Sequence, residues 1–364
     1  MLFALRPGRT ENPFGEWLLG NLPSRVDSRW FSWRAAIFGR YDIFHVHWPE
    51  YLFDSGSPFK ASVKALLGFA LIMRLVIGNI PVVQTVHTQR PYEGVRRLAA
   101  LQARMLARRT VFRIYLNESD ENDYSHGGVV LLGRYEYPIE RAINTANDER
   151  LLFFGQIREY KGIEELLKAF AGFESESAAL VIVGPPINPP YVAKVKALAS
   201  HDPRVTVDMR RLTNEELVAT IDEAALVVLP YRTMYNSSAL LLALDRGVPV
   251  LAPASPSNLR IQEEVGDRWL QLFDEVLDGA TLERAIQSAR QVSSAEMIRP
   301  SLSRREWSTI GQLHGALYDI VYAVARGNRR VDLRREQVRL RVQRDTQFRS
   351  HSKLNASRAK SPDS

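Results

Sequence analysis

The sequence predicts an α/β protein made of two domains of similar size, each built on a parallel sheet covered by helices, with a cleft between them. Three observations indicate this fold class. Strand-like and helix-like segments alternate along the 364-residue chain, and the alternation restarts after a polar linker at residues 135–150. The strand-like segments are continuous apolar runs, as expected for parallel strands buried on both faces. The length also suits two ordinary domains.

The first domain is expected at residues 1–145. Its strands are predicted by five short apolar runs, at residues 1–5, 42–47, 81–87, 112–117 and 127–132. Amphipathic or apolar segments at residues 60–77 and 95–109 predict the helices that connect these strands.

The second domain is expected at residues 146–300. Its strands are predicted by apolar runs at residues 151–155, 178–184, 205–209, 225–230, 248–252 and 268–273. Helices are predicted at residues 163–173, 191–200 and 214–223, and the segment 239–244, Ala-Leu-Leu-Leu-Ala-Leu, predicts a further helix that is buried on all sides.

A last long helix is predicted within residues 303–327, because its apolar residues recur at helical spacing. We assign residues 301–326 to a C-terminal helix that packs back toward the first domain.

The composition excludes several classes of protein. The chain contains no cysteine, so it has no disulfide framework, thiol nucleophile or cysteine-based metal site, and it suits a reducing compartment. Its start lacks the pattern of a signal peptide, and no clean apolar stretch reaches the length of a membrane span. No spacing of histidines or acids indicates a metal site, so we expect neither a metal nor a cofactor.

The positive charge of the chain is concentrated in a tail at residues 327–364. From Arg326 onward there are 12 Lys and Arg against 4 Asp and Glu, of the 48 and 41 in the whole chain, so the rest is close to neutral. One interpretation is a solvated, disordered extension. The other is electrostatic attachment to an anionic membrane surface. Specific nucleic-acid binding is not expected, because the tail has a single aromatic residue.

Two loops of the second domain could bind an anion, because ligands of parallel sheets bind beyond the carboxyl ends of the strands. Gly155 ends one strand, and Arg158 and Lys161 precede the next helix. They are either phosphate ligands or solvated loop cations. In the other loop, Asn236, Ser237 and Ser238 begin the apolar helix without an acid, which leaves N–H donors for a diphosphate; alternatively they are ordinary caps.

A proline-rich loop begins at Pro185. It could line the binding site of the nucleotide base or of the sugar, or it could be a rigid connector.

In the first domain, two strand ends carry histidine, an aromatic residue and glutamate. His47, Trp48 and Glu50 follow one strand, and His87 and Glu93 follow another. His87 could donate a hydrogen bond or take a proton, and either glutamate could be a general base or an exposed loop carboxylate. For His45 and His47, which alternate on one strand, a structural role is favoured.

The first strand is followed by a polar segment that contains Asn12. This segment could also reach the cleft, on the acceptor side together with His47 and Trp48.

The segments 151–186 and 227–253 together resemble the donor-binding half of GT-B glycosyltransferases, whose two domains are Rossmann-like. Within this fold the sequence is similar to the family-4-like enzymes of bacterial exopolysaccharide and glycolipid synthesis. The pattern Gly-x-x-x-x-x-Lys-Gly at residues 155–162 and the Pro-Tyr-Arg and Asn-Ser-Ser triplets at residues 230–238 carry the resemblance, which covers residues 1–325. It implies that Lys161 pairs with a donor diphosphate and that Tyr231 belongs to the donor site.

The sequence also departs from that family's pattern. Gln156 stands where the family usually has arginine, and Arg158 would supply the missing cation. Met234 and Leu242 stand where the family has two glutamates around the donor sugar, which puts the usual retaining stereochemistry in doubt.

The resemblance implies a nucleotide-sugar-dependent glycosyltransferase, with a weak preference for GDP-mannose as donor and a saccharide or lipid-linked acceptor. The alternative is a catalytically inactive partner subunit with the same fold. The expected location is cytoplasmic, peripheral at the inner face of the plasma membrane.

Overall fold

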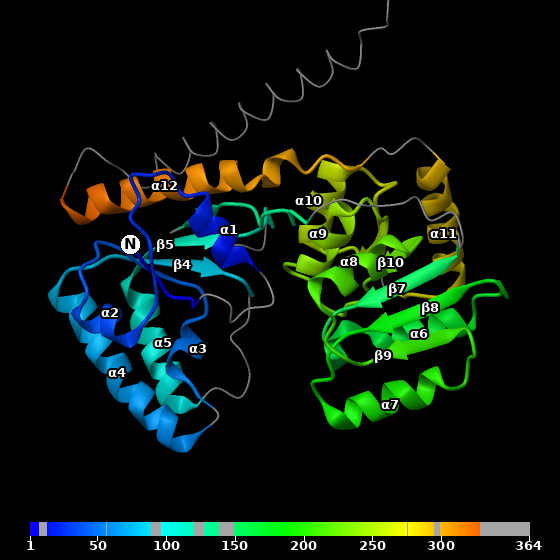
Figure 1. The fold of residues 1–364 in the computed structure, drawn as a ribbon, viewed down its shortest axis with the longest axis horizontal. Coiled ribbons are helices and arrows are strands. Elements are labelled where there is room, and N and C mark those ends of the chain that lie inside the picture. Colours follow the sequence, from blue (N-terminus) through cyan, green and yellow to red (C-terminus); the bar gives the residue numbers. More distant parts are fainter. Residues whose placement is uncertain are drawn as a thin grey trace, which may run out of the picture. The chain divides into compact units, whose positions relative to one another are not determined.

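The computed structural model describes residues 1–6, 13–55, 57–88, 96–119, 127–137, 149–274, 276–294 and 299–327. Contacts divide the chain into two units: Met1–Gly133 with the segment from Arg304 onward, and Arg134–Ser303. Each unit contains one six-stranded sheet in which all pairings are parallel (Figure 1). The predicted α/β class with two parallel sheets is confirmed.

The sheet of the first unit has the strand order β2-β1-β3-β4-β5-β6. Its strands are β1 (Leu2–Phe3), β2 (Arg29–Trp30), β3 (Phe44–Val46), β4 (Val82–Val86), β5 (Thr110–Tyr115) and β6 (Gly127–Val129). The chain moves from β1 outward to β2 and then back to β3 on the other side of β1. Because the strand order reverses there, the loops after β1 and β3 diverge above the sheet, which is where open α/β sheets bind ligands.

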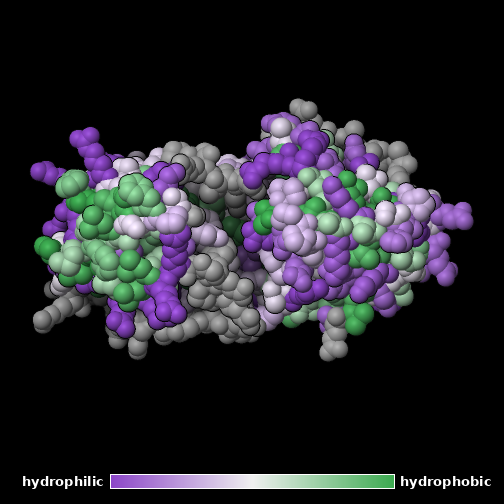
Figure 2. Space-filling view, turned by 90° about the horizontal axis from the view of Figure 1, so that it is seen from below, coloured by the Kyte–Doolittle hydropathy of each residue, from purple (hydrophilic) through white to green (hydrophobic). Residues whose placement is uncertain are grey.

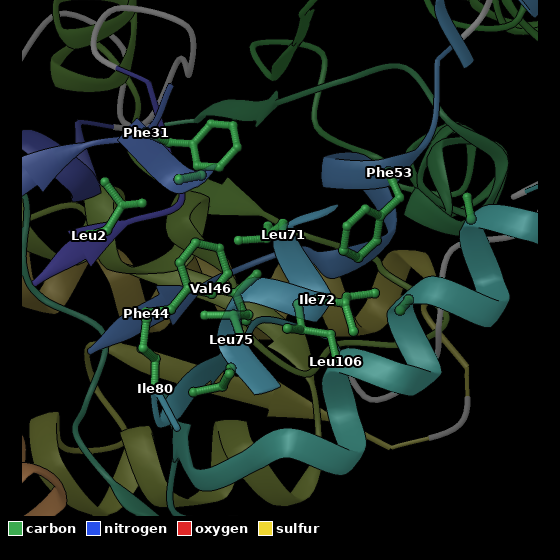
Figure 3. Close-up of a cluster of buried hydrophobic side chains, with 14 residues drawn as sticks. Leu2, Phe31, Phe44, Val46, Phe53, Leu71, Ile72, Leu75, Ile80 and Leu106 are labelled. Carbon is green, nitrogen blue, oxygen red and sulfur yellow. The ribbon is translucent and has the colours of Figure 1, made fainter. Parts of the chain in front are cut away.

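Helices cover the sheet of the first unit on both faces (Figure 1). They are α1 (Phe14–Gly20), α2 (Trp33–Phe38), α3 (Pro49–Phe53), α4 (Pro58–Ile77), α5 (Arg97–Arg109) and α12 (Trp307–Ala325). Buried side chains from β3, α4 and α5 form a continuous apolar core, in which Phe44, Leu71, Leu75 and Leu106 interdigitate (Figure 3).

Glycines allow helix α12 to approach both the end of α1 and the segment after β6 closely. A Cβ on Gly311 would lie 1.9 Å from the carbonyl oxygen of Asn21, and a Cβ on Gly133 would lie 2.5 Å from the ring of Trp307. Larger residues at these positions would push the helix away. The C-terminal helix is therefore an integral part of the first unit.

The second unit has the strand order β12-β11-β10-β7-β8-β9. Its strands are β7 (Arg150–Phe154), β8 (Ala179–Val183), β9 (Val205–Asp208), β10 (Leu226–Val228), β11 (Val250–Pro253) and β12 (Leu270–Phe273). All six strands were predicted from their apolar runs. The order reverses between β7 and β10, so the loops that follow these two strands frame the predicted ligand position.

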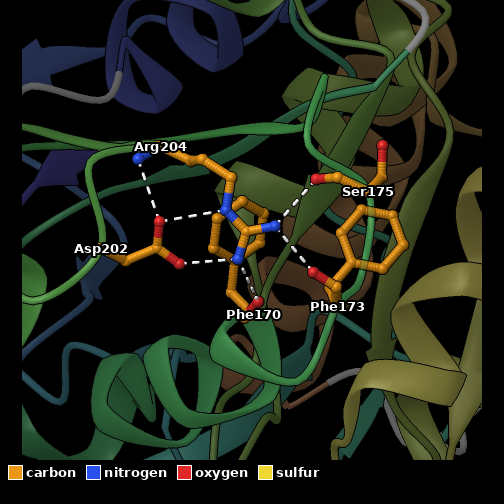
Figure 4. A network of polar contacts seen from close by, with 5 residues as sticks. All are labelled: Phe170, Phe173, Ser175, Asp202 and Arg204. Atoms are coloured by element: carbon orange, nitrogen blue, oxygen red, sulfur yellow. Dashed lines mark hydrogen bonds and ion pairs between the residues drawn. The ribbon is translucent and has the colours of Figure 1, made fainter.

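The first five helices of the second unit connect consecutive strands, and the sixth follows the last strand. They are α6 (Ile163–Ala171), α7 (Pro189–Ala199), α8 (Asn214–Asp222), α9 (Ser238–Asp245), α10 (Pro256–Val265) and α11 (Gly279–Ser294). At the end of α6 the guanidinium of Arg204 donates to the Asp202 carboxylate and to the carbonyl oxygens of Phe170, Phe173 and Ser175 (Figure 4). This network stabilises the sheet at the amino ends of its strands, which is the end remote from the ligand-binding loops.

The short elements at the start of the chain were not predicted. Helices α1, α2 and α3 and the two-residue strand β2 are too brief for a periodic pattern to emerge. The predicted helix at residues 191–200 begins two residues earlier, at Pro189, because proline is well suited to a first helical turn. Among the described residues, no helix is both long enough and apolar enough to span a bilayer.

Candidate functional site

In the second unit, glycines bring three ligand-side loops into contact. Gly162 has φ +68°, and a Cβ there would lie 1.8 Å from the carbonyl oxygen of Pro230, at the end of β10. Gly184 has φ +151°, and a Cβ there would lie 1.9 Å from the carbonyl oxygen of Gly155. Only glycine fits both the backbone conformation and the space. The loops after β7, β8 and β10 therefore converge, as the predicted donor site requires.

Lys161 lies at the centre of this convergence. Its Nζ is 3.6 Å from the centroid of the Tyr231 ring and 5.4 Å from that of Tyr160. Burial, with a smaller contribution from the charge of Arg158, lowers the pKa of Lys161 from 10.5 to about 7. A cation held against aromatic rings beside a second cation is well placed to bind an anion, because the anion would restore its ordinary pKa.

The start of α9 adds backbone donors to the same region. Ser237 is the N-cap of the helix, and its Oγ accepts a hydrogen bond from the Leu240 amide over 3.2 Å. Tyr231 is buried beside this turn, and burial raises the pKa of its hydroxyl above the ordinary range. Ser237 is thus a cap, as one interpretation of the sequence held, and the first turn of α9 carries no acidic side chain that would compete with a phosphate.

The positions at which the family usually has glutamate are filled by packed apolar side chains. Met234 is 8% exposed and Leu242 is 4% exposed. Asn258, in the first turn of α10, donates to the Met234 sulfur over 3.1 Å and to the carbonyl oxygen of Pro253 over 2.8 Å. Sequence reasoning missed this support by α10, although the Ser-Pro-Ser-Asn run at residues 255–258 is a recognisable helix start.

The proline-rich loop pairs with the glycine loop. The Ile157 amide donates to the carbonyl oxygen of Pro185 over 3.0 Å, and Ile157 forms an isolated parallel bridge with Pro186. This contact supports the connector interpretation of Pro185. That this loop lines the binding site of the base or the sugar stays a prediction.

In the first unit, the ends of β3 and β4 bring His47, Trp48 and His87 together. Nδ1 of His47 and Nε2 of His87 share a hydrogen bond of 2.9 Å. The indole of Trp48 stacks on the His87 ring, with a centroid distance of 4.0 Å and an interplanar angle of 22°. Phe14, from α1, contacts the His87 ring edge-on at 5.6 Å. This packing fixes the orientation of the His87 ring.

His45 has a structural role, as predicted. Its ring is fully buried and bridges the hydroxyls of Tyr318 on α12 and Thr85 on β4, at 2.7 and 2.8 Å. His314 on α12 lies nearby, with its ring centroid 6.1 Å from that of His45. The sequence could not reveal His314 and Tyr318 as members of this cluster, because they come from the far end of the chain.

Burial keeps these histidines neutral. It lowers the pKa of His45 and His47 well below 6.5, that of His87 to about 3 and that of His314 to about 4. A neutral imidazole exchanges hydrogen bonds with a hydroxyl but is a weak proton acceptor when its pKa is this low. Of the two roles considered for His87, the structure favours hydrogen bonding.

The remaining predicted residues are less informative. Glu50 lies half-buried in the first turn of α3, directly after Trp48 and Pro49. Glu93, Asn12 and the tail beyond residue 327 fall outside the described residues. Within the described ranges, no group of three or more His, Asp or Glu side chains is arranged to hold a metal.

Comparison with known proteins agrees with this fold. Residues 148–276 match the family of group 1 glycosyl transferases. A GDP-mannose:glycolipid 4-β-D-mannosyltransferase from Xanthomonas campestris pv. campestris is 36% identical over 316 residues, which cover 86% of this chain and 89% of that protein. A second protein of the same name and pathovar is 35% identical over the same shares.

Two solved structures share the fold. Sucrose-phosphate synthase from Thermosynechococcus elongatus superposes with a TM-score of 0.56 at 18% identity, over 80% of this chain and 76% of that one. HepE from Anabaena, in complex with UDP and glucose, superposes with a TM-score of 0.54 at 16% identity, over 70% of this chain and 76% of that one.

The two parallel sheets give this chain the GT-B fold that these solved structures share. The chain belongs to the group 1 glycosyl transferases and is a nucleotide-sugar-dependent enzyme. The alternative of an inactive partner subunit is therefore not retained.

Proposed function

We propose that this enzyme transfers mannose from GDP-mannose to a lipid-linked saccharide. The observation that carries the proposal is the similarity to two GDP-mannose:glycolipid mannosyltransferases over 86% of the chain, which includes both units. Similarity confined to the second unit would support only the use of a nucleotide sugar as donor. Similarity in the first unit also supports an acceptor of the same class.

In this proposal the second unit binds the diphosphate of the donor. Lys161 and Arg158 supply positive charge, and the first turn of α9, with Asn236, Ser237 and Ser238, supplies hydrogen-bond donors. Charge builds up on the leaving diphosphate as the bond to the sugar breaks. Fixed cations and helix N–H groups stabilise that charge and lower the barrier without a metal.

The sugar is transferred with inversion at its anomeric carbon. GDP-mannose carries an α-linked sugar, so the β-linked product named for the relatives requires attack from the opposite face. Met234 and Leu242 are compatible with this outcome, since the glutamates typical of the retaining family members are replaced by packed apolar residues. Inversion needs a base for the acceptor hydroxyl, and Glu50 or Glu93 would fill that role.

His87 would orient the acceptor or the transferred sugar through a hydrogen bond, held in place by His47 and Trp48. Asn12, His47 and Trp48 would line the acceptor side. The protein would work at the cytoplasmic face of the plasma membrane, in exopolysaccharide synthesis, where the basic tail could add electrostatic attraction.

A thermal-shift comparison of GDP, UDP, ADP and TDP sugars tests the donor. Bound GDP-mannose should raise the melting temperature in a concentration-dependent way, because a ligand that binds only the folded state stabilises it by mass action. Lys161→Ala should reduce that shift, whereas Lys168→Ala, on the following helix, should not. A shift with UDP sugars and none with GDP-mannose would contradict the proposed donor.

A further inference from the structure

Helix α4 has apolar side chains on two opposite faces. One face is buried in the core of the first unit through Ala61, Ala65, Leu71, Ile72 and Leu75. The other is open to solvent and contains large apolar residues at helical spacing: Phe59, Val63, Leu66, Phe69, Met73, Val76 and Ile77. Phe59, Leu66 and Ile77 are 78%, 73% and 78% exposed. Packing within the described part of this unit does not account for this second face.

Neighbouring helices extend the exposed face. Leu98 and Leu101 on α5 are 44% and 49% exposed, and Phe38, at the end of α2, is 80% exposed. Both helices pack directly against α4. Figure 2 shows the resulting apolar patch over the lower surface of the first unit, bordered by hydrophilic side chains. Contiguous exposed patches of this kind normally mark an interaction site.

The charged side chains on the two main helices of the patch have one sign. Helices α4 and α5 contain seven Lys and Arg residues and no Asp or Glu. Lys60, Arg97, Arg104 and Arg108 are exposed, and the last three recur along the outer side of α5 at helical spacing. From residue 55 to residue 117 the sequence contains ten basic residues and a single acid, Glu93. The patch is therefore apolar at its centre and cationic at its rim.

We propose that this face of α4 and α5 is the surface through which the protein rests on an anionic phospholipid bilayer. Its apolar side chains enter the boundary between headgroups and acyl chains, and its arginines pair with lipid phosphates, as in interfacial amphipathic helices. A second copy of the chain fits less well, because a two-fold interface would bring the same cations against each other. The inference stands on the folded unit and does not depend on which sugar is transferred or on the tail.

The test is cosedimentation of the full-length chain with vesicles of phosphatidylcholine, with and without phosphatidylglycerol. The wild type should bind the mixed vesicles. The double variant Leu66→Glu, Met73→Glu should bind more weakly, by at least about tenfold for each of its two substitutions, because each substitution removes the burial of one apolar side chain. Val276→Glu, at a residue of the second unit that is 70% exposed, is the matched control and should bind as the wild type does.

A second variant, Arg97→Gln with Arg104→Gln and Arg108→Gln, separates the two contributions. It should lose most of the preference for phosphatidylglycerol and the salt dependence of binding. Thermal unfolding midpoints should be unchanged in all variants, because the substituted side chains are exposed.

Three results would overturn the proposal. One is undiminished binding by the Leu66→Glu, Met73→Glu protein, which would place the contact on the tail or elsewhere. Another is absence of binding by the wild type. The third is a wild-type dimer in sedimentation velocity that this double variant abolishes, which would show that a second copy covers the face. None of these results bears on donor binding in the thermal-shift comparison, so the two proposals fail independently.

Discussion

At the scale of single residues, Lys161 connects fold to chemistry most directly. The sequence identified it as a cation before a helix, but its pKa could not be predicted, because the ring of Tyr231 that covers it arrives from a later loop. The burial that lowers this pKa to about 7 makes the protonation of Lys161 responsive to a bound diphosphate near neutral pH.

Donor affinity should therefore depend on pH through Lys161. The pKa is depressed in the free enzyme and raised again by the bound anion, so binding takes up a proton above about pH 7. We expect the affinity for GDP-mannose to be flat below that pH and to fall by up to about tenfold for each pH unit above it. Calorimetry in two buffers of different ionisation enthalpy measures the proton uptake.

Lys161→Arg is the control, because an arginine side chain keeps its charge throughout this range. Its affinity should not change with pH between about 6.5 and 8.5, whatever its absolute value. A wild-type affinity equally insensitive to pH, with no proton uptake, would contradict either the lowered pKa of Lys161 in the free enzyme or its contact with the donor.

His87 offers a second prediction at this scale. His87→Ala should leave GDP-mannose affinity nearly unchanged, because the ring lies in the unit that does not hold the donor loops. Turnover should fall by about 10²-fold, the usual effect of losing one fixed hydrogen-bond donor at a reacting group. His201→Ala, an exposed position in the second unit, should have wild-type turnover. Wild-type turnover by His87→Ala would remove His87 from the site.

At the scale of elements, strongly apolar segments were predicted, whereas the brief elements and the more polar helices α10 and α11 were not. The strands of the second unit and helix α4 follow directly from their apolar runs. The outward apolar face of α4 could not be inferred, because a helix that is apolar on all sides is normally read as buried, and only the packing shows which side has no partner. The histidine cluster likewise required α12 to be placed against β3 and β4.

Helix α12 depends on Gly311 for its position in the first unit. Gly311→Ala should destabilise the protein by about 1–3 kcal/mol, because the added methyl group would collide with the backbone of Asn21. Calorimetry should show a lower midpoint for the transition of the first unit. Gly20→Ala, where an added Cβ meets nothing within 4 Å, is the control and should be neutral or mildly stabilising. Equal midpoints for both variants would contradict the tight contact between α12 and α1.

At the scale of the whole molecule, function is divided between the two units. The second unit presents cations and a helix start suited to a diphosphate, and the first presents a rigid cluster of neutral imidazoles, together with a surface suited to lipid. An enzyme that moves a sugar from a water-soluble donor to a lipid-linked acceptor needs both properties. The sequence predicted the parallel sheet of the second unit well, because its strands are continuous apolar runs. It did not indicate the proposed membrane surface, because the net charge of the chain is concentrated in the basic tail.

The anomeric configuration of the product is the decisive test of mannosyl transfer from GDP-mannose with inversion. The purified enzyme is given GDP-mannose and a lipid-linked oligosaccharide, and the product is analysed by NMR, with Lys161→Ala as the parallel control. We expect a single added mannose in the β configuration, formed by the wild type and strongly reduced in the variant. An α-linked product, or transfer from a UDP sugar but not from GDP-mannose, would contradict it.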